Sequence, residues 1–194
     1  MPPGETPHPA LTRLLRGVPD PEAALLADAY AVAAQAHAGQ VRRQGTPYID
    51  HPLEVALILR EKLGVDDPAM LAAALLHDAV EDSELTLADL RRFPDETQRL
   101  VALLTDPEPA MTSSARRAHH AGIWRDPDAT LLKAADRLSN IGDVIAQGDP
   151  AFGRRYIRKT RREILGAGLP LASHPAATPL LRAALTRAAR DLGV

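Results

Sequence analysis

Four ionisable side chains fall within six residues of the segment LLHDAVED: His77, Asp78, Glu81 and Asp82. The rest of that segment consists of apolar residues typical of a buried helix, where charged groups without partners are costly. On a helix, His77 lies one turn from Glu81 and Asp78 lies one turn from Asp82, so the four side chains form two neighbouring rows. Three carboxylates this close repel one another unless a positive charge lies among them. A divalent cation would meet both needs.

His77 and Asp78 alone do not complete a coordination sphere, so further ligands must come from elsewhere in the chain. His51 and Asp136 are the candidates. The four side chains would supply two imidazoles and two carboxylates from three helices, with room for water or substrate oxygens. Nitrogen and oxygen ligands of this kind suit manganese or magnesium, with iron, cobalt or zinc as further possibilities.

Each added ligand also has a simpler interpretation. His51 precedes a proline and could cap a helix or be an ordinary buried histidine. Asp136, in LLKAADRLSN, could form a core ion pair with Lys133 or Arg137. Glu81 and Asp82 could be ordinary solvated acids, although the negative end of a helix dipole disfavours acids there.

The chemistry expected of such a metal is the hydrolysis of a phosphate ester or anhydride. A bound cation polarises a phosphoryl oxygen and lowers the pKa of a bound water, so that hydroxide attacks phosphorus. Glu81 and Asp82, one turn beyond the ligands, would exchange protons with that water or with the leaving oxygen and position the water. The chain has no cysteine, which excludes a thiolate metal site, a disulfide framework and a cysteine nucleophile.

The elements that must position these residues are all expected to be helices. Pro21 and Glu22 open the first helix and Gly39 ends it, while Pro52 and Gly64 bracket the second. Residues 39–50 and 105–129 are rich in glycine, proline or serine, and are expected to be a loop and a mobile or partly helical connection. The helical segments expected are 21–37, 52–63, 69–82, two short helices within 86–104 broken before Pro94, 130–148, 150–166 and 178–192.

Composition supports an all-α fold. Apolar residues make up 45% of the 194 residues and aromatic residues only 3%, so the core must be built mainly from Ala, Leu, Val and Ile. The bias towards Ala and Leu favours helices over strands. We expect one domain over residues 1–194, with a core at about 21–166 and a C-terminal helical extension at 167–194.

Charge is divided unevenly along the chain. Residues 1–110 carry a formal charge of −9 and residues 111–194 carry +7, which nearly cancel in the net charge of −2. A cationic surface beside an acidic metal site would suit a phosphorylated small molecule, although solvated helix faces that happen to differ are an alternative. The basic excess is too small, and aromatic residues are too few, to predict a nucleic-acid binder. The sequence shows no signal peptide and no membrane span, so a cytoplasmic protein is expected.

The order of these motifs resembles that of the HD phosphohydrolase superfamily, with His51, then His77-Asp78, then Asp136. Three longer strings are similar to the hydrolase domain of RelA/SpoT-type alarmone enzymes, in the same order and spacing over about residues 25–165. These strings are AHAGQVRRQGTPYIDHPLEVA (36–56), AALLHDAVEDSELT (73–86) and KAADRLSNI (133–141). The resemblance implies a compact multi-helix HD-domain fold.

The resemblance also implies an activity. That family hydrolyses the 3′-pyrophosphate of (p)ppGpp in a manganese-dependent reaction that yields GDP or GTP and pyrophosphate. By resemblance, His51, His77, Asp78 and Asp136 match its metal ligands, and Glu81 and Asp82 match its catalytic acids. A related alarmone such as (p)ppApp would suit the same chemistry.

Substrate contacts can be carried over from the resemblance as well. Arg42 and Arg43 fall where the family has an Arg-Lys pair that packs on the base and contacts phosphates, both tasks for a planar guanidinium. Asn140 and Asp143 share a helix face with Asp136 that could meet ribose and base. Tyr156, in RRYIRKTRRE, would close the nucleotide pocket, although a solvated basic helix with one amphipathic tyrosine is the alternative.

The chain departs from its relatives in the third motif. Many long bifunctional members read DRLHNMRT where this chain has DRLSNIGD, which affects residues expected near the ribose or base. The chain resembles the stand-alone small alarmone hydrolases, so alarmone synthesis is not expected. The alternatives are an HD-type phosphatase for another nucleotide, such as NADPH or a nucleoside monophosphate, and a catalytically silent nucleotide-binding regulator. The presence of Glu81 and Asp82 argues against the regulator.

Overall fold

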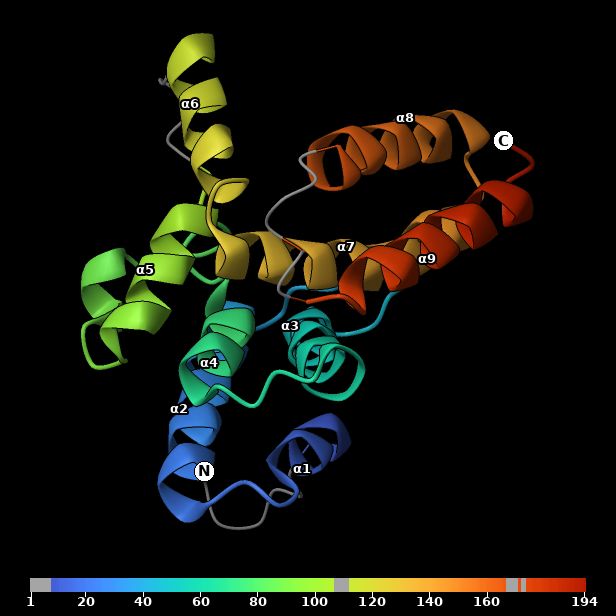
Figure 1. Cartoon of the computed structure of the whole chain (residues 1–194). Coiled ribbons are helices and arrows are strands. Elements are labelled where there is room, and N and C mark those ends of the chain that lie inside the picture. Colours follow the sequence, from blue (N-terminus) through green and yellow to red (C-terminus); the bar gives the residue numbers. More distant parts are fainter. Residues whose placement is uncertain (1–7, 107–111, 167–170, 172–173) are drawn as a thin grey trace. The chain divides into compact units, whose positions relative to one another are not determined.

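The structure is a computed structural model that describes most of the chain, and every regular element in the described part is a helix, as expected (Figure 1). No helix there is both long enough and apolar enough to span a lipid bilayer. The described residues are 8–106, 112–166, 171 and 174–194.

The chain divides into two compact units, which are described separately. Unit 1 comprises residues 1–40 and 47–106, and unit 2 comprises residues 41–46 and 107–194. The expectation of one domain over 1–194 remains a prediction.

Unit 1 is built around the helix α4 (Pro68–Leu76), which packs against α2, α3 and α5. Every side chain from Met70 to Leu76 is buried, because this stretch contains only Ala, Leu and Met. Figure 1 shows these helices in blue to green. The other helices of unit 1 are α1 (Pro9–Leu15), α2 (Asp20–Ala36), α3 (Asp50–Leu57), the π-turn η1 (Ile58–Lys62), the 3₁₀ turn η2 (Leu87–Leu90) and α5 (Asp95–Leu104).

The helix that precedes the acidic cluster is shorter than expected. It ends at Leu76 instead of residue 82, so Asp78, Glu81 and Asp82 lie in the turns that follow. The His77 ring supplies the physical reason, because its Nδ1 donates to the Ala74 carbonyl at 2.9 Å, an oxygen that a continuing helix would use for a backbone N–H. The predicted extent of this helix, residues 69–82, is therefore wrong at its C-terminal end.

The helix that carries His51 begins earlier than expected. It starts at Asp50 instead of Pro52, because Ile49 already has helical backbone angles and the His51 N–H donates to the Tyr48 carbonyl at 2.9 Å. His51 therefore lies in the first turn and is not the capping residue. The helical segment continues through the π-turn η1 and ends before Gly64, whose φ is +71°.

The helix boundaries in segment 86–104 of unit 1 fall where the sequence predicted them. The segment 86–104 forms two short helices separated by Pro94, as predicted. Thr86 and Asp89 form a reciprocal capping box at the start of the first one. The short helix α1 was not expected.

Unit 2 consists of α6 (Ser113–Ile123), α7 (Pro127–Gln147), α8 (Pro150–Thr160), the π-turn η3 (Arg161–Leu165) and α9 (Ala177–Asp191). Asp126 caps α7 and accepts a hydrogen bond from the Ala129 N–H at 2.9 Å, so this helix begins three residues before the expected 130. The predicted connection 105–129 contains α6, and its residues 107–111 lie outside the described part.

The last helix belongs to the body of unit 2. Helix α9 packs against α7 and α8, and its Leu181, Leu185 and Ala188 side chains are buried. Residues 167–170 and 172–173 of the expected extension lie outside the described part of the chain.

Candidate metal and nucleotide site

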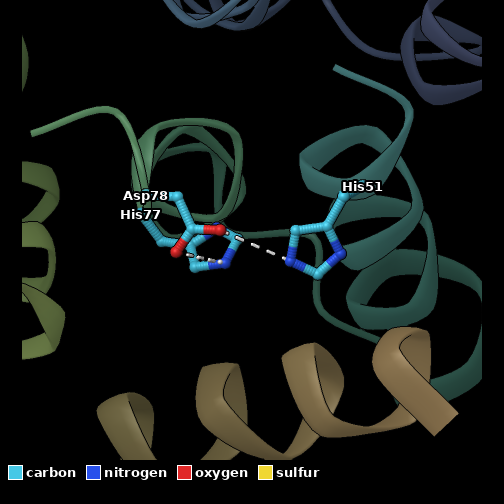
Figure 2. A group of neighbouring side chains, drawn as sticks. All are labelled: His51, His77 and Asp78. Atoms are coloured by element: carbon cyan, nitrogen blue, oxygen red, sulfur yellow. Dashed lines mark ion pairs between the residues drawn. The ribbon is translucent and has the colours of Figure 1, made fainter. Parts of the chain in front are cut away.

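Three of the predicted metal ligands meet in unit 1. His51 comes from the first turn of α3, while His77 and Asp78 follow α4 directly, and Figure 2 shows the two rings and the carboxylate turned towards one another. The His51 Nε2 lies 3.5 Å from Asp78 Oδ2, and the His77 Nε2 lies 3.2 Å from Asp78 Oδ1. One ligand atom from each of the three residues lies within 4.8 Å of the others.

These separations suit a first-row divalent cation. Such a metal holds nitrogen and oxygen ligands at about 2.0–2.2 Å, so neighbouring ligands around it are about 3 Å apart. The two observed histidine-to-carboxylate distances, 3.2 and 3.5 Å, are close to that value. The three residues could therefore hold a cation with little rearrangement.

The hydrogen bonding of His77 fixes which nitrogen would face the metal. A carbonyl oxygen only accepts, so the 2.9 Å contact with Ala74 places the proton on Nδ1. In the neutral ring, Nε2 then carries the lone pair that a metal requires. A histidine ligand oriented through its second nitrogen is a recurrent feature of metal sites in proteins.

Burial strengthens the electrostatics of the cluster. His51 is 3% exposed and His77 is 1% exposed, whereas the Asp78 side chain is 17% exposed. The ring centroids of the two histidines are 5.2 Å apart. The two imidazoles of the cluster are therefore buried, and the Asp78 carboxylate is its most solvent-exposed member.

Tyr48 is a site residue that the sequence analysis missed. Its hydroxyl lies 2.8 Å from Asp78 Oδ2, to which it donates, and 3.2 Å from Asp82 Oδ2. Burial of the phenol, followed by the negative charge of Asp78, raises the pKa of Tyr48 well above its ordinary value, so the hydroxyl keeps its proton. The signal in the sequence was the position of Tyr48 three residues before His51; its half-burial, which calls for a polar partner for the hydroxyl, is known only from the structure.

A second layer of contacts holds Tyr48 and Asp82 in place. The ring of buried His37 packs on the ring of Tyr48 with centroids 4.6 Å apart. The His37 Nδ1 lies 2.9 Å from the Gln40 side-chain oxygen, and the Gln40 side-chain nitrogen donates to the Asp82 backbone carbonyl at 2.7 Å. The end of α2 therefore supports the acidic turn.

The two predicted catalytic acids are both exposed but differ in how they are held. Asp82 is fixed through its backbone N–H, which donates to the Asp78 carbonyl at 2.9 Å, as well as through Tyr48. Glu81 accepts a hydrogen bond from the Asp106 backbone N–H at 3.3 Å. Both carboxylates lie in the turn that follows the ligand Asp78, within a few residues of it.

Asp136 belongs to unit 2, where its side chain is 7% exposed. One oxygen lies 3.0 Å from the Lys133 ammonium, and the other accepts a hydrogen bond from the Asn140 amide at 2.5 Å. The ion pair with Lys133 that was considered as an alternative is therefore present. The Arg137 guanidinium lies 3.5 Å from the Glu163 carboxylate. The role of Asp136 as a metal ligand remains a prediction.

The two predicted phosphate-binding arginines are fastened within unit 2. The Arg42 Nη2 lies 2.6 Å from Asp143 Oδ2. The Arg43 Nη1 donates to the Gln147 side chain at 2.6 Å, and its guanidinium lies 5.5 Å from the ring centre of Phe152. Asp143 thus contacts the segment 41–46, which carries Arg42 and Arg43, and this contact was not predicted from the sequence.

Tyr156 packs within unit 2 beside Arg137. Its hydroxyl donates to the Arg137 backbone carbonyl at 3.2 Å, and the Arg137 guanidinium lies 5.2 Å from the centre of its ring. Burial, followed by the charge of Asp136, raises the pKa of Tyr156 above its ordinary value. Its role in closing a nucleotide pocket remains a prediction, as does that of Asn140.

Comparison with known proteins identifies the family. The family model of the HD domain matches residues 29–167, which is more than half of the chain. The chain belongs to the HD domain family. The matched region contains His51, His77, Asp78 and Asp136, the residues expected to carry the family's chemistry.

Curated relatives show which HD-domain proteins this chain resembles in sequence. The chain is 40% identical over 127 residues to the human guanosine-3′,5′-bis(diphosphate) 3′-pyrophosphohydrolase MESH1, which covers 63% of this chain and 71% of that relative. It is also 40% identical over 141 residues to the GTP pyrophosphokinase of Streptomyces coelicolor. That match covers 70% of this chain but only 15% of the relative, so the chain spans a small part of that longer enzyme.

A solved structure shares the fold of this HD domain. It is that of a metazoan orthologue of SpoT that hydrolyses ppGpp, and it matches with a TM-score of 0.70 at 25% sequence identity. The match covers 88% of this chain and 96% of the other. The all-helical HD fold expected from the sequence is therefore confirmed.

Proposed function

We propose that this protein is a metal-dependent enzyme that hydrolyses the 3′-pyrophosphate of (p)ppGpp or of a related alarmone such as (p)ppApp. The observation that carries the proposal is the cluster of His51, His77 and Asp78 in a chain 40% identical to a 3′-pyrophosphohydrolase. The products would be GDP or GTP, or the adenine analogue, and pyrophosphate.

The metal would be held by His51, His77 and Asp78, with Asp136 as the fourth protein ligand. The donor set of two imidazoles and carboxylates supports Mn²⁺, with Mg²⁺ or another divalent metal as substitutes. When bound, the metal supplies Lewis-acid polarisation of a phosphoryl oxygen and lowers the pKa of water. The protonation of His77 Nδ1 and the spacing of the three donors in unit 1 support this assignment.

The remaining chemistry falls to Glu81 and Asp82. Water adds its oxygen to phosphorus, the bond between that phosphorus and the 3′-oxygen breaks, and the 3′-oxygen takes up a proton. One carboxylate removes a proton from the attacking water, and the other donates a proton to the leaving oxygen. Asp82 is held at its backbone and by the Tyr48 hydroxyl, which suits it to orienting water, whereas Glu81, which accepts a 3.3 Å hydrogen bond from the Asp106 N–H, suits proton exchange.

The substrate is proposed to be a small nucleotide and not a nucleic acid. Arg42 and Arg43 would contact its phosphates and base, while Asn140 and Tyr156 would lie near the ribose and base. Arginine suits this role because its planar group stacks on rings and binds phosphate with two hydrogen bonds. Because such a substrate is a free metabolite, we place the activity in the cytoplasm.

The test is a product assay with metal-stripped protein, with and without added Mn²⁺. The substrates are ppGpp, pppGpp, ppApp and NADPH, and pyrophosphate and phosphate are measured separately. We expect pyrophosphate from one or more of the alarmones, and only when the metal is present. Phosphate from NADPH alone would identify the alternative phosphatase, and no product from any substrate would contradict the enzyme.

Variants assign the roles within that assay. Glu81→Gln should bind Mn²⁺ as tightly as the wild type but lose about 100-fold or more in kcat, the size expected for general acid–base catalysis. Asp66→Asn is the matched control, because Asp66 is 86% exposed and lies on the loop before α4. Turnover that survives in Glu81→Gln would exclude Glu81 from the proton transfer.

A further inference from the structure

The segment 41–46 is a tight turn whose ends are closed by its own backbone. The Arg42 N–H donates to the Thr46 carbonyl at 2.8 Å, and the Gly45 N–H donates to the Arg42 carbonyl at 2.8 Å. Gly45 has a φ of +82°, a conformation that favours glycine. The turn carries Arg42, Arg43 and Gln44 as one block, so whatever holds the block positions all three side chains.

Asp143 on α7 holds this turn by two contacts. Its Oδ2 lies 2.6 Å from the Arg42 guanidinium, and its Oδ1 accepts a hydrogen bond from the Gln44 side chain. The two side chains of the ion pair are only 10% and 20% exposed, so solvent screens their attraction weakly. Both oxygens of the carboxylate are therefore engaged by the turn.

The neighbouring contacts on Arg43 are weaker because they are exposed or uncharged. Gln147, one helical turn after Asp143, accepts a hydrogen bond from Arg43, and Phe152 on α8 lies beneath the Arg43 guanidinium. Arg155 also lies over Phe152, 5.9 Å from its centre. Asp143 thus gives the turn a charged contact, whereas Gln147 and Phe152 are uncharged.

We propose that Asp143 is a positioning residue that holds the turn 41–46 against α7 and so fixes Arg42 and Arg43 for the phosphates of the nucleotide. This proposal rests on the proposed function for the identity of the ligand. It assigns Asp143 a role through Arg42, in place of a direct contact with ribose or base. The chemical class that the fixed pair recognises is a nucleotide bearing a diphosphate.

Limited trypsin digestion tests the docking without any substrate. Trypsin cleaves after arginine, so the bonds following Arg42 and Arg43 report directly on whether the turn is held. We expect Asp143→Ala to raise cleavage at these bonds about fivefold, the size expected for loss of one charge-assisted contact. Glu96→Gln, which removes the carboxylate of the exposed Glu96–Arg99 pair on α5, is the matched control and should leave this cleavage unchanged.

A double-mutant cycle then tests how Asp143 acts on the substrate. If Asp143 acts through Arg42 and the turn, Asp143→Ala should raise KM about tenfold with little change in kcat, and should have a clearly smaller effect in an Arg42→Ala background. Asp143→Asn keeps the acceptor for Gln44 and should give an intermediate KM. The affinity for Mn²⁺ should be the same in all four variants, the double variant included.

Two results would overturn the proposal. The first is unchanged trypsin cleavage in Asp143→Ala, which would show that Asp143 does not hold the turn. The second is a full additional rise in KM when Asp143→Ala is combined with Arg42→Ala, which would indicate that Asp143 contacts the nucleotide itself. Absence of alarmone hydrolysis in the wild type would instead refute the proposed function, and the digestion would still report on the docking.

Discussion

The hydroxyl of Tyr48 lies 2.8 Å from the carboxylate of Asp78 and links this proposed metal ligand to Asp82, one of the acids proposed for catalysis. A single proton thus neutralises part of the repulsion between two neighbouring carboxylates. The same hydroxyl fixes the direction in which Asp78 presents its second oxygen. The ligand geometry depends on a residue that would not itself bind the metal.

Replacing Tyr48 by Phe removes that proton while the ring still packs on His37. We expect the affinity for Mn²⁺ to fall about tenfold and kcat to fall with it, because both carboxylates lose their shared donor. Isothermal titration with Mn²⁺ and a product assay would measure the two effects. Tyr30→Phe on α2, whose ring lies 6.3 Å from that of His8, is the control and should change neither. Unchanged metal affinity in Tyr48→Phe would show that the hydroxyl has no orienting role.

Metal binding should stabilise the folded protein, because the unfolded chain does not bring the three ligands together. At a Mn²⁺ concentration of about 100 times Kd, the gain is about 2.7 kcal/mol, or roughly 5–10 °C in Tm for a chain of this size. Thermal unfolding with and without Mn²⁺ measures this shift. Asp78→Ala should abolish the shift, while Asp66→Asn should retain it. A full shift in Asp78→Ala would place the metal elsewhere.

The stability of α8 should depend on pH through Asp149. Hydrogen bonds from the backbone N–H groups of Phe152 and Ala151 lower the pKa of this capping carboxylate below its ordinary value. A lowered folded-state pKa means that the stabilisation is complete above the unfolded pKa of about 3.9 and is lost as the pH falls through the folded value. Urea unfolding of the wild type and Asp149→Asn from about pH 3 to pH 7 should show their difference shrinking at the acidic end. A constant difference would exclude this ionisation.

Two glycines of the same region should respond in opposite ways to alanine. Gly148 ends α7 with a φ of +64°, so Gly148→Ala should cost about 1 kcal/mol of unfolding free energy. Gly142 lies inside α7, and a Cβ there would meet nothing within 4 Å. Gly142→Ala should therefore stabilise the helix by up to about 1 kcal/mol. Chemical denaturation measures both values, and the same sign for both variants would contradict the assigned backbone conformations.

Helix boundaries were predictable where proline and glycine mark them. Pro94 separates η2 from α5, and Gly64 and Gly148 end helices as expected. The grouping of His51 with His77 and Asp78 was also anticipated, because charged side chains in an apolar run require partners. These signals are local, or follow from the cost of burying charge.

The features that the sequence did not predict depend on individual side-chain contacts. The end of α4 at Leu76 results from the bond between the His77 ring and the Ala74 carbonyl, which helical periodicity cannot reveal. The contact of Gln44 with Asp143 joins residues 99 positions apart. Tyr48 lies in a segment without periodicity, so its direction could not be deduced before the turn was known.

The buried stretch of helix α4, residues 70–76, also bears on how this protein can evolve. His77 follows Leu76 directly, and every side chain from Met70 to Leu76 is enclosed. A substitution that alters this helix would move His77, a proposed metal ligand, and would also weaken the packing of unit 1, so we expect few substitutions there. A substitution of an exposed side chain in the turn 41–46 would not have both of these effects. Substitutions that change nucleotide preference among relatives should therefore accumulate in that turn and at Asp143 and Gln147, which hold it, while the sequence of α4 should change slowly.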